Sequence, residues 1–218
     1  AEPWVDGAHG LASPHPRLPL TRRFWFPGFT ERSGGLLRER ALMEERDAFR
    51  RSAALRSALW SSVGVPEPAA GELRASVFCY DDAPLSALLD AWASGARPVV
   101  AVLPRGVAAA TIEQWRGGGS RLAPGAPLSR GCLTLHAIPF LPQDGYDRLL
   151  WACDVNFVRG EDSLVRAQWA ARPFVWQAYP QGEGAHHAKR DALLERYAGA
   201  LDAPAAIAVE ANTFTLAR

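Results

Sequence analysis

The chain has 218 residues, of which 48% are hydrophobic, and its formal net charge at pH 7 is +1. This composition supplies enough apolar side chains for a packed core and excludes a largely disordered chain. The nearly balanced charge gives no electric field that would favour nucleic acid or an anionic membrane surface as a partner.

Residues 1–37 are rich in proline and glycine, which favours extended and turn structure over helix. The chain begins with Ala1 rather than Met, and we expect this segment to be a linker or the tail of a preceding domain. Residues 38–70 form a helical connector in our interpretation. Its scattered apolar residues among charged residues and alanines predict one or two amphipathic helices over Leu36–Trp60.

Strand-like and helix-like runs then alternate, and they predict one domain over residues 71–200. The predicted strands are Ala75–Tyr80, Pro98–Leu103, Leu133–Ile138, Val155–Val158 and Pro173–Gln177. The predicted helices are Leu85–Ser94, Val107–Trp115, Tyr146–Cys153, Ser163–Ala171 and Ala188–Tyr197. This alternation predicts an α/β fold with a Rossmann-like, largely parallel sheet that helices cover on both faces. Ligands of such sheets bind outside the carboxyl ends of the strands.

The most informative run ends an apolar strand in a glycine turn that leads into a helix. Gly160 permits a sharp turn, and the helix that follows offers unpaired N–H groups and a positive dipole end to an anion. Arg159 adds a planar fork of donors that fits phosphate oxygens. Ser163 can bond an oxygen, and Glu161 or Asp162 can bond a sugar hydroxyl. The run predicts a diphosphate site; the alternative is an ordinary capped helix.

Aromatic side chains at two other strand ends are candidates for binding a nucleobase. Phe140 can stack on a base, and the amide of Gln143 can pair with its edge. Alternatively, Phe140 belongs to the core and Gln143 takes the place of an N-cap residue. Phe78 and Tyr80 share one face of a strand, where aromatic residues are often core. Tyr80 is the better candidate for reaching a ligand, because polar residues follow it.

Neither a metal ion nor a cofactor is predicted. His186 and His187 are adjacent, and adjacent side chains on a helix diverge by about a hundred degrees, so they cannot chelate one ion together. Asp81-Asp82 has the appearance of a metal motif but is equally compatible with a turn. Neither a P-loop nor a GxGxxG fingerprint occurs in the sequence.

The three cysteines and the hydropathy pattern predict a cytoplasmic protein. The cysteines are odd in number and have no CxxC spacing, which favours buried thiols in a reducing compartment. No apolar stretch approaches the roughly twenty residues that span a bilayer, and no signal peptide is recognisable. We therefore expect no membrane partner.

One known family has closely similar sequence in several segments. They are CDVNFVRGEDSLVRAQ (Cys153–Gln168), PFLPQDGYDRLL (Pro139–Leu150), Phe78-Cys79-Tyr80, Phe174-Val175-Trp176, Tyr179-Pro180-Gln181 and Phe26-Pro27-Gly28-Phe29-Thr30. Together they closely resemble the elongation factor P arginine rhamnosyltransferases, the EarP family. The resemblance runs from about Glu2 to about Tyr197.

The resemblance implies the donor-binding half of a two-domain (GT-B type) glycosyltransferase. Such an enzyme moves rhamnose from TDP-rhamnose to one arginine of elongation factor P, with inversion and without a metal. The implied thymidine-binding residues are Phe78, Tyr80, Phe140 and Gln143. The implied diphosphate- and sugar-binding residues are Arg159, Glu161, Asp162 and Ser163, with Tyr179 as an addition, and Arg159 and Asp162 are the implied catalytic residues.

Two departures from the family pattern qualify that expectation. The family begins with another Rossmann-like domain, whose DNYGD-type loop supplies the aspartate proposed as general base, and nothing in this chain matches it. Residues 1–37 would then be the tail of that acceptor domain, and we expect this chain alone to be inactive. Residues 201–218 are unlike the C-terminal helices of the family and form an atypical tail.

Two other functions stay open at this stage. The first is a non-catalytic module that binds a TDP-sugar or elongation factor P. The second is a different sugar-nucleotide transferase or epimerase, although the nicotinamide fingerprint that is usual in epimerases is absent.

Overall fold

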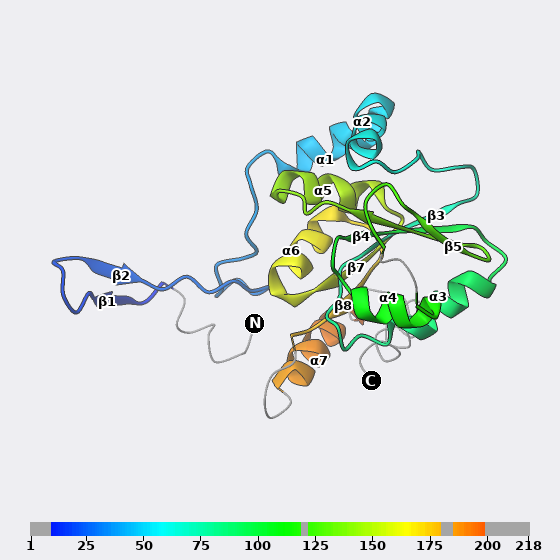
Figure 1. Ribbon diagram of the computed structural model, residues 1–218. Coiled ribbons are helices and arrows are strands. Elements are labelled where there is room, and N and C mark those ends of the chain that lie inside the picture. Colours follow the sequence, from blue (N-terminus) through cyan, green and yellow to red (C-terminus); the bar gives the residue numbers. More distant parts are fainter. Residues whose placement is uncertain (1–9, 119–121, 180–184, 199–218) are drawn as a thin grey trace.

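The computed structural model describes residues 10–118, 122–179 and 185–198. At its centre is a six-stranded sheet with the order β5-β6-β4-β3-β7-β8 (Figure 1). The strands are β3 (Leu73–Val77), β4 (Val99–Pro104), β5 (Leu128–Arg130), β6 (Leu133–Ile138), β7 (Val155–Arg159) and β8 (Phe174–Gln177). All neighbours pair in parallel except β5 and β6, which are antiparallel. The predicted α/β fold with a largely parallel sheet is confirmed.

Helices cover both faces of this sheet, as predicted. They are α1 (Leu42–Arg51), α2 (Ala53–Val63), α3 (Leu85–Ser94), α4 (Ala109–Arg116), α5 (Gln143–Ala152), α6 (Gly160–Ala170) and α7 (Ala185–Ala198). In Figure 1, α1, α2 and α5 lie on one side of the sheet and α3 and α4 on the other. Successive side chains of β4 alternate between the two cores: Ala101 and Leu103 pack toward α3 and α4, whereas Val102 joins the cluster of α1, α2, α5 and α6.

The strand order places an opening at one point of the sheet edge. From β3 the chain adds β4 and then β6 on one side, and β7 and then β8 on the other, so the order reverses between β3 and β7. In open parallel sheets ligands bind at such a switch point. Ser76 and Asn156 fix this junction, since the Ser76 hydroxyl donates to Asn156 Oδ1 (2.6 Å) and Asn156 Nδ2 donates to the Leu150 carbonyl of α5 (3.1 Å).

Most element boundaries agree with the sequence prediction within two residues, but α5 begins at Gln143 rather than Tyr146 and α7 at Ala185 rather than Ala188. β3 ends at Val77 rather than Tyr80, because the Tyr80 backbone N–H donates to the Gln177 side chain (2.8 Å) instead of a neighbouring strand. α6 begins at Gly160, three residues before the predicted Ser163, so the glycine turn leads directly into the helix. Strand β5 was not predicted; it is a three-residue edge strand beside β6.

The region before the sheet contains a hairpin and two helices. Strands β1 (Ala12–Pro14) and β2 (Thr21–Arg23) pair antiparallel and project away from the rest of the molecule (Figure 1). α1 and α2 confirm the predicted helices of the connector, and Ser52 separates them by capping α2 at Leu55 (3.2 Å). The predicted tail at residues 201–218 lies outside the described residues. Among the helices of the described ranges, none has the length and apolar character needed to cross a membrane.

Burial of the cysteines leads to a first prediction, concerning alkaline stability. Cys79 and Cys153 are buried free thiols, as predicted, whereas Cys132 is half-buried. Burial raises the pKa of the Cys79 thiol from 9.0 to about 11. The unfolded chain therefore loses this proton at lower pH than the folded chain. The contribution of the Cys79 thiol to the free energy of unfolding is complete below pH 9 and is lost as the pH rises toward 11.

We expect the free energy of unfolding in urea to fall between pH 7 and pH 10, and Cys79→Ala to remove on the order of 1 kcal/mol of that decline. Urea titrations of the unaltered chain and of Cys79→Ala, each at pH 7 and at pH 10, measure this decline. An equally steep decline in the variant would show that Cys79 does not contribute.

Candidate functional site

A pocket opens at the carboxyl edge of the sheet, between the ends of β3, β4 and β6 and the first turns of α5 and α6. Its cavity volume is about 210 Å³ when open solvent is excluded. The walls are mostly apolar, and five of the lining side chains carry a polar group. The pocket is lined by Phe78, Pro104, Ile138, Pro139, Phe140, Leu141, Gln143, Tyr146, Leu149, Asp162, Ser163 and Arg166.

Five of the predicted site residues line this pocket, from three different strand ends: Phe78, Phe140, Gln143, Asp162 and Ser163. Phe140 is 66% exposed, so the alternative that it belongs to the core is wrong. Gln143 is the first residue of α5 and follows the N-cap residue Pro142, so it does not act as the cap. The sheet thus brings aromatic and amide side chains that follow β3 and β6 into one pocket with a carboxylate and a hydroxyl that follow β7.

Three predicted residues lie beside the pocket and form a stack. The Arg159 guanidinium lies over the rings of Phe78 (4.2 Å) and Tyr80 (4.7 Å). One of its five N–H groups donates to the Cys79 carbonyl (2.9 Å). The Tyr80 ring in turn meets Tyr179 edge to face, with ring centroids 5.6 Å apart. Cation–π contacts with two rings therefore hold Arg159 at the rim of the sheet, next to a residue that lines the pocket.

Glu161 differs from the other predicted residues. Its carboxylate forms an ion pair with Lys189 of α7 (3.0 Å), and its side chain is 57% exposed. It does not line the pocket. The structure therefore places Glu161 against α7 rather than among the pocket side chains.

The first turn of α6 has the features of an anion site. Arg159 is the N-cap residue, with extended backbone, and its side chain makes no capping hydrogen bond. Gly160 has a φ of +66°, and a Cβ there would lie 3.0 Å from the Tyr80 hydroxyl, so glycine is needed for both conformation and space. Asp162 and Ser163 line the pocket without forming a side-chain cap at this N-cap. The first N–H groups of a helix bond to side chains, to water or to an anionic ligand.

Tyr146 is a pocket residue that the sequence analysis missed. Its ring meets Phe78 edge to face, with centroids 6.1 Å apart. The hydroxyl lies near Ser163 but forms no hydrogen bond with the described part of the chain. Burial raises its pKa to about 12, so it stays neutral near pH 7 and can donate to a ligand. Its position three residues after Gln143, on the same face of a helix, was the signal available in the sequence.

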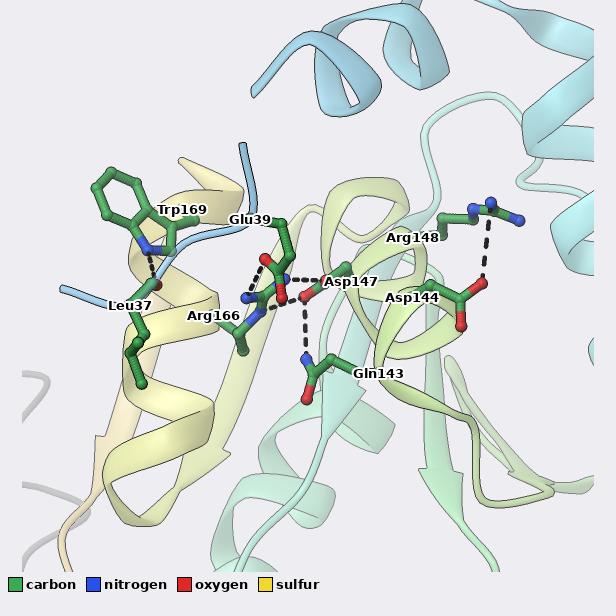
Figure 2. Close-up of polar contacts among 8 residues, drawn as sticks. All are labelled: Leu37, Glu39, Gln143, Asp144, Asp147, Arg148, Arg166 and Trp169. Carbon is green, nitrogen blue, oxygen red and sulfur yellow. Dashed lines mark hydrogen bonds and ion pairs between the residues drawn. The ribbon is translucent and has the colours of Figure 1, made fainter. Parts of the chain in front are cut away.

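An ion-pair network centred on the buried residue Arg166, which lines the pocket, was also missed. Figure 2 shows Arg166 reaching from α6 to Asp147 of α5, with Glu39 of the connector beside it. Arg166 Nε donates to Asp147 Oδ1 (2.7 Å), its Nη2 bonds Oδ2, and its Nη1 bonds Glu39 Oε2 (2.7 Å). Burial would lower the pKa of Arg166, but the two carboxylates raise it, and the bond from Arg166 lowers the pKa of Glu39. Glu39 and Arg166 are 127 residues apart, so no local pattern indicates the pair.

The residues that the structure describes contain no group of three or more His, Cys, Asp or Glu side chains placed to hold a metal ion.

A family model and the similar proteins found by comparison are all described as rhamnosyltransferases. The family model described as Elongation-Factor P (EF-P) rhamnosyltransferase EarP matches residues 1–217. The protein-arginine rhamnosyltransferase of Pseudomonas putida is 47% identical over 209 residues, which are 95% of this chain and 55% of that protein. The Pseudomonas aeruginosa relative of the same description is 42% identical over 217 residues, which are 100% of this chain and 56% of that protein.

A solved structure has the same fold. It is described as the structural basis for EarP-mediated arginine glycosylation of translation elongation factor EF-P. It is 43% identical, with a TM-score of 0.76, and the match covers 85% of this chain and 58% of that one. The chain thus spans about half the length of the relatives it matches. Since the family model matches nearly every residue, the chain belongs to the EF-P rhamnosyltransferase (EarP) family.

Proposed function

We propose that the chain is the donor-binding half of a GT-B type glycosyltransferase. The complete enzyme transfers rhamnose from TDP-rhamnose to an arginine of elongation factor P, with inversion and without a metal or cofactor. In this proposal residues 71–200 are the donor domain and residues 38–70 the connector to an acceptor domain, of which residues 1–37 are the tail. The relatives at 42–47% identity are protein-arginine rhamnosyltransferases, which supports the reaction class.

One observation carries the proposal: the same pocket is lined by an aromatic ring and an amide that could bind a base, and by side chains from the first turn of α6, where an anion could bind. Phe140 and Gln143 after β6 supply an exposed ring and an amide, and Asp162 and Ser163 lie in the first turn of α6. In the proposal the thymine stacks on Phe140, and the diphosphate lies at the N-terminus of α6. In the proposal Arg159 adds its charge beside the diphosphate, Phe78 and Tyr80 line the thymidine end, and Tyr179 extends the surface next to Tyr80.

The transfer requires activation of the attacking guanidinium on one side of the sugar and stabilisation of the leaving diphosphate on the other. A guanidinium nitrogen is a weak nucleophile because its lone pair is delocalised, so a carboxylate must orient it and accept its proton. On the leaving side, negative charge develops on the diphosphate, and Arg159 and the α6 N–H groups stabilise it. We propose that Asp162 holds the sugar for this step. The family's general-base aspartate has no counterpart in this chain.

Titration calorimetry of the chain with TDP and TDP-rhamnose tests the donor site. We expect saturable binding of both at one site per chain; no heat of binding for either nucleotide would contradict the proposal. Transfer is tested separately by mass spectrometry of elongation factor P, using a relative of full length. Binding without transfer by that relative would favour the non-catalytic module.

A second prediction concerns Gly160. Gly160→Ala places a Cβ 3.0 Å from the Tyr80 hydroxyl at a φ of +66°. We expect a loss of roughly 1–2 kcal/mol in the free energy of unfolding from the left-handed conformation, and weaker TDP binding because Tyr80 must move.

Gly64→Ala is the matched control for this change. Gly64 has a φ of +68° with no atom within 4 Å of the added carbon. It should lose similar stability and keep full TDP affinity, as calorimetry and urea titration of both variants will show. Equal TDP affinity in the two variants would mean that Tyr80 and Gly160 are not part of the site.

A further inference from the structure

The side-chain amide of Gln143 is hydrogen-bonded to the buried ion pair of Asp147 and Arg166. Gln143 Nε2 donates to Asp147 Oδ1 (3.3 Å), and the same oxygen accepts a hydrogen bond from Arg166 Nε (2.7 Å). Gln143 lines the pocket, whereas Asp147 is only 4% exposed. The amide thus stands between the ligand space and a carboxylate that solvent hardly reaches.

This arrangement fixes which end of the amide faces the pocket. A carboxylate held in the fork of an arginine only accepts hydrogen bonds, so Gln143 can turn only its NH₂ group toward Asp147. The opposite orientation would bring Gln143 Oε1 against Asp147 Oδ1, two acceptors with no proton between them. Oε1 and the second N–H of the amide remain for the ligand.

The carboxylate itself is held rigidly. Arg166 bonds both oxygens of Asp147 from α6, and Glu39 holds the third nitrogen of the guanidinium from the connector (Figure 2). Arg166 and Asp147 are 8% and 4% exposed, so the two bonds between them are largely shielded from water, whereas the Glu39 side chain is 60% exposed. A side chain ordered before the ligand arrives loses less conformational entropy on binding than a free glutamine.

We propose that Asp147, held by Arg166, is a positioning residue for Gln143 and so contributes to nucleotide affinity without touching the nucleotide. The inference rests on the proposed nucleotide site. The ligand edge that Gln143 recognises presents an N–H donor beside a carbonyl acceptor, as the imide edge of a pyrimidine does.

A double-mutant cycle measured by calorimetry with TDP tests this role. Asp147→Asn replaces one carboxylate oxygen by an NH₂ group, which breaks the arginine fork and offers Gln143 either a donor or an acceptor. We expect Gln143→Ala and Asp147→Asn each to weaken TDP binding roughly 5-fold. The double variant should bind as Gln143→Ala does, because Asp147 then has no side chain to position.

Asp144→Asn is the matched control. Asp144 lies on the same helix but pairs with Arg148 (3.9 Å), away from Arg166 and Asp147 (Figure 2), and the change removes the same charge. Its TDP affinity should equal that of the unaltered chain. Multiplying losses in the double variant would overturn the inference alone, whereas absence of TDP binding by the unaltered chain would overturn it together with the proposed function.

An NMR measurement on the unaltered chain covers the case in which Asp147→Asn does not fold. The Gln143 amide protons and the Arg166 Hε point at one oxygen, so a nuclear Overhauser effect between them is expected. Its absence, with both signals assigned, would also overturn the inference.

Discussion

Replacement of Arg166 by methionine is expected to lower the free energy of unfolding by about 3–5 kcal/mol. The change leaves the Asp147 carboxylate, 4% exposed, without the two hydrogen bonds that compensate for its burial. It also releases Glu39 and so loosens the contact between the connector and α6. Urea titration monitored by circular dichroism gives the loss directly.

Arg148→Met is the control for Arg166→Met. Arg148 pairs with Asp144 at 3.9 Å, and both side chains are more than half exposed, so its loss should cost less than about 1 kcal/mol. Adding Asp147→Leu to Arg166→Met should recover part of the stability, because no unpaired charge then remains buried. A loss of stability for Arg166→Met as small as that for Arg148→Met would show that the Arg166–Asp147 ion pair does not stabilise the fold.

The largest effect on ligand binding is expected for Arg159→Ala, which should weaken TDP binding roughly 10- to 100-fold. The variant removes the charged donors beside the α6 N-terminus, and it also takes away the guanidinium that packs on Phe78 and Tyr80. Arg159→Lys keeps the charge but not the planar fork, so its affinity should lie between those of Arg159→Ala and the unaltered chain. Calorimetry with TDP measures all three proteins.

Arg105→Ala is the control for overall charge. Arg105 is exposed in the loop after β4, at the same edge of the sheet, and does not line the pocket. It should change TDP affinity only slightly. In a full-length relative, alanine at the positions of Arg159 and Asp162 should lower kcat/KM for transfer, and unchanged kinetics in both variants would refute the assignment of these residues.

The five parallel strands could be predicted from the sequence because buried strands and helices have a regular pattern of apolar residues. The apolar strands and amphipathic helices after residue 71 alternate regularly, and helix Leu85–Ser94 and strand Leu133–Ile138 agree with the prediction at both ends. β5 has no such pattern of apolar residues, since it is three residues long and partly exposed. The end of β3 was misplaced because a side chain, Gln177, took over the hydrogen bond of the Tyr80 backbone.

The candidate site was predictable where chemistry follows a strand end in the sequence. Phe140, Gln143, Asp162 and Ser163 lie in βα loops or first helical turns, and the parallel sheet necessarily brings these to one edge. The ion pairs of Arg166 with Asp147 and Glu39 could not be predicted from the sequence. Arg166 and its carboxylate partners come from three separate segments, and a charged residue within a helix usually faces solvent.

The central claim is that the pocket holds the base at Phe140 and Gln143 and the diphosphate at the first turn of α6. A crystal structure of the chain soaked with TDP measures this directly. We predict the thymine ring against Phe140 with its edge at Gln143, and phosphate oxygens within hydrogen-bond distance of the α6 N–H groups and Ser163. Density for the nucleotide elsewhere on the molecule, with this pocket empty, would contradict it.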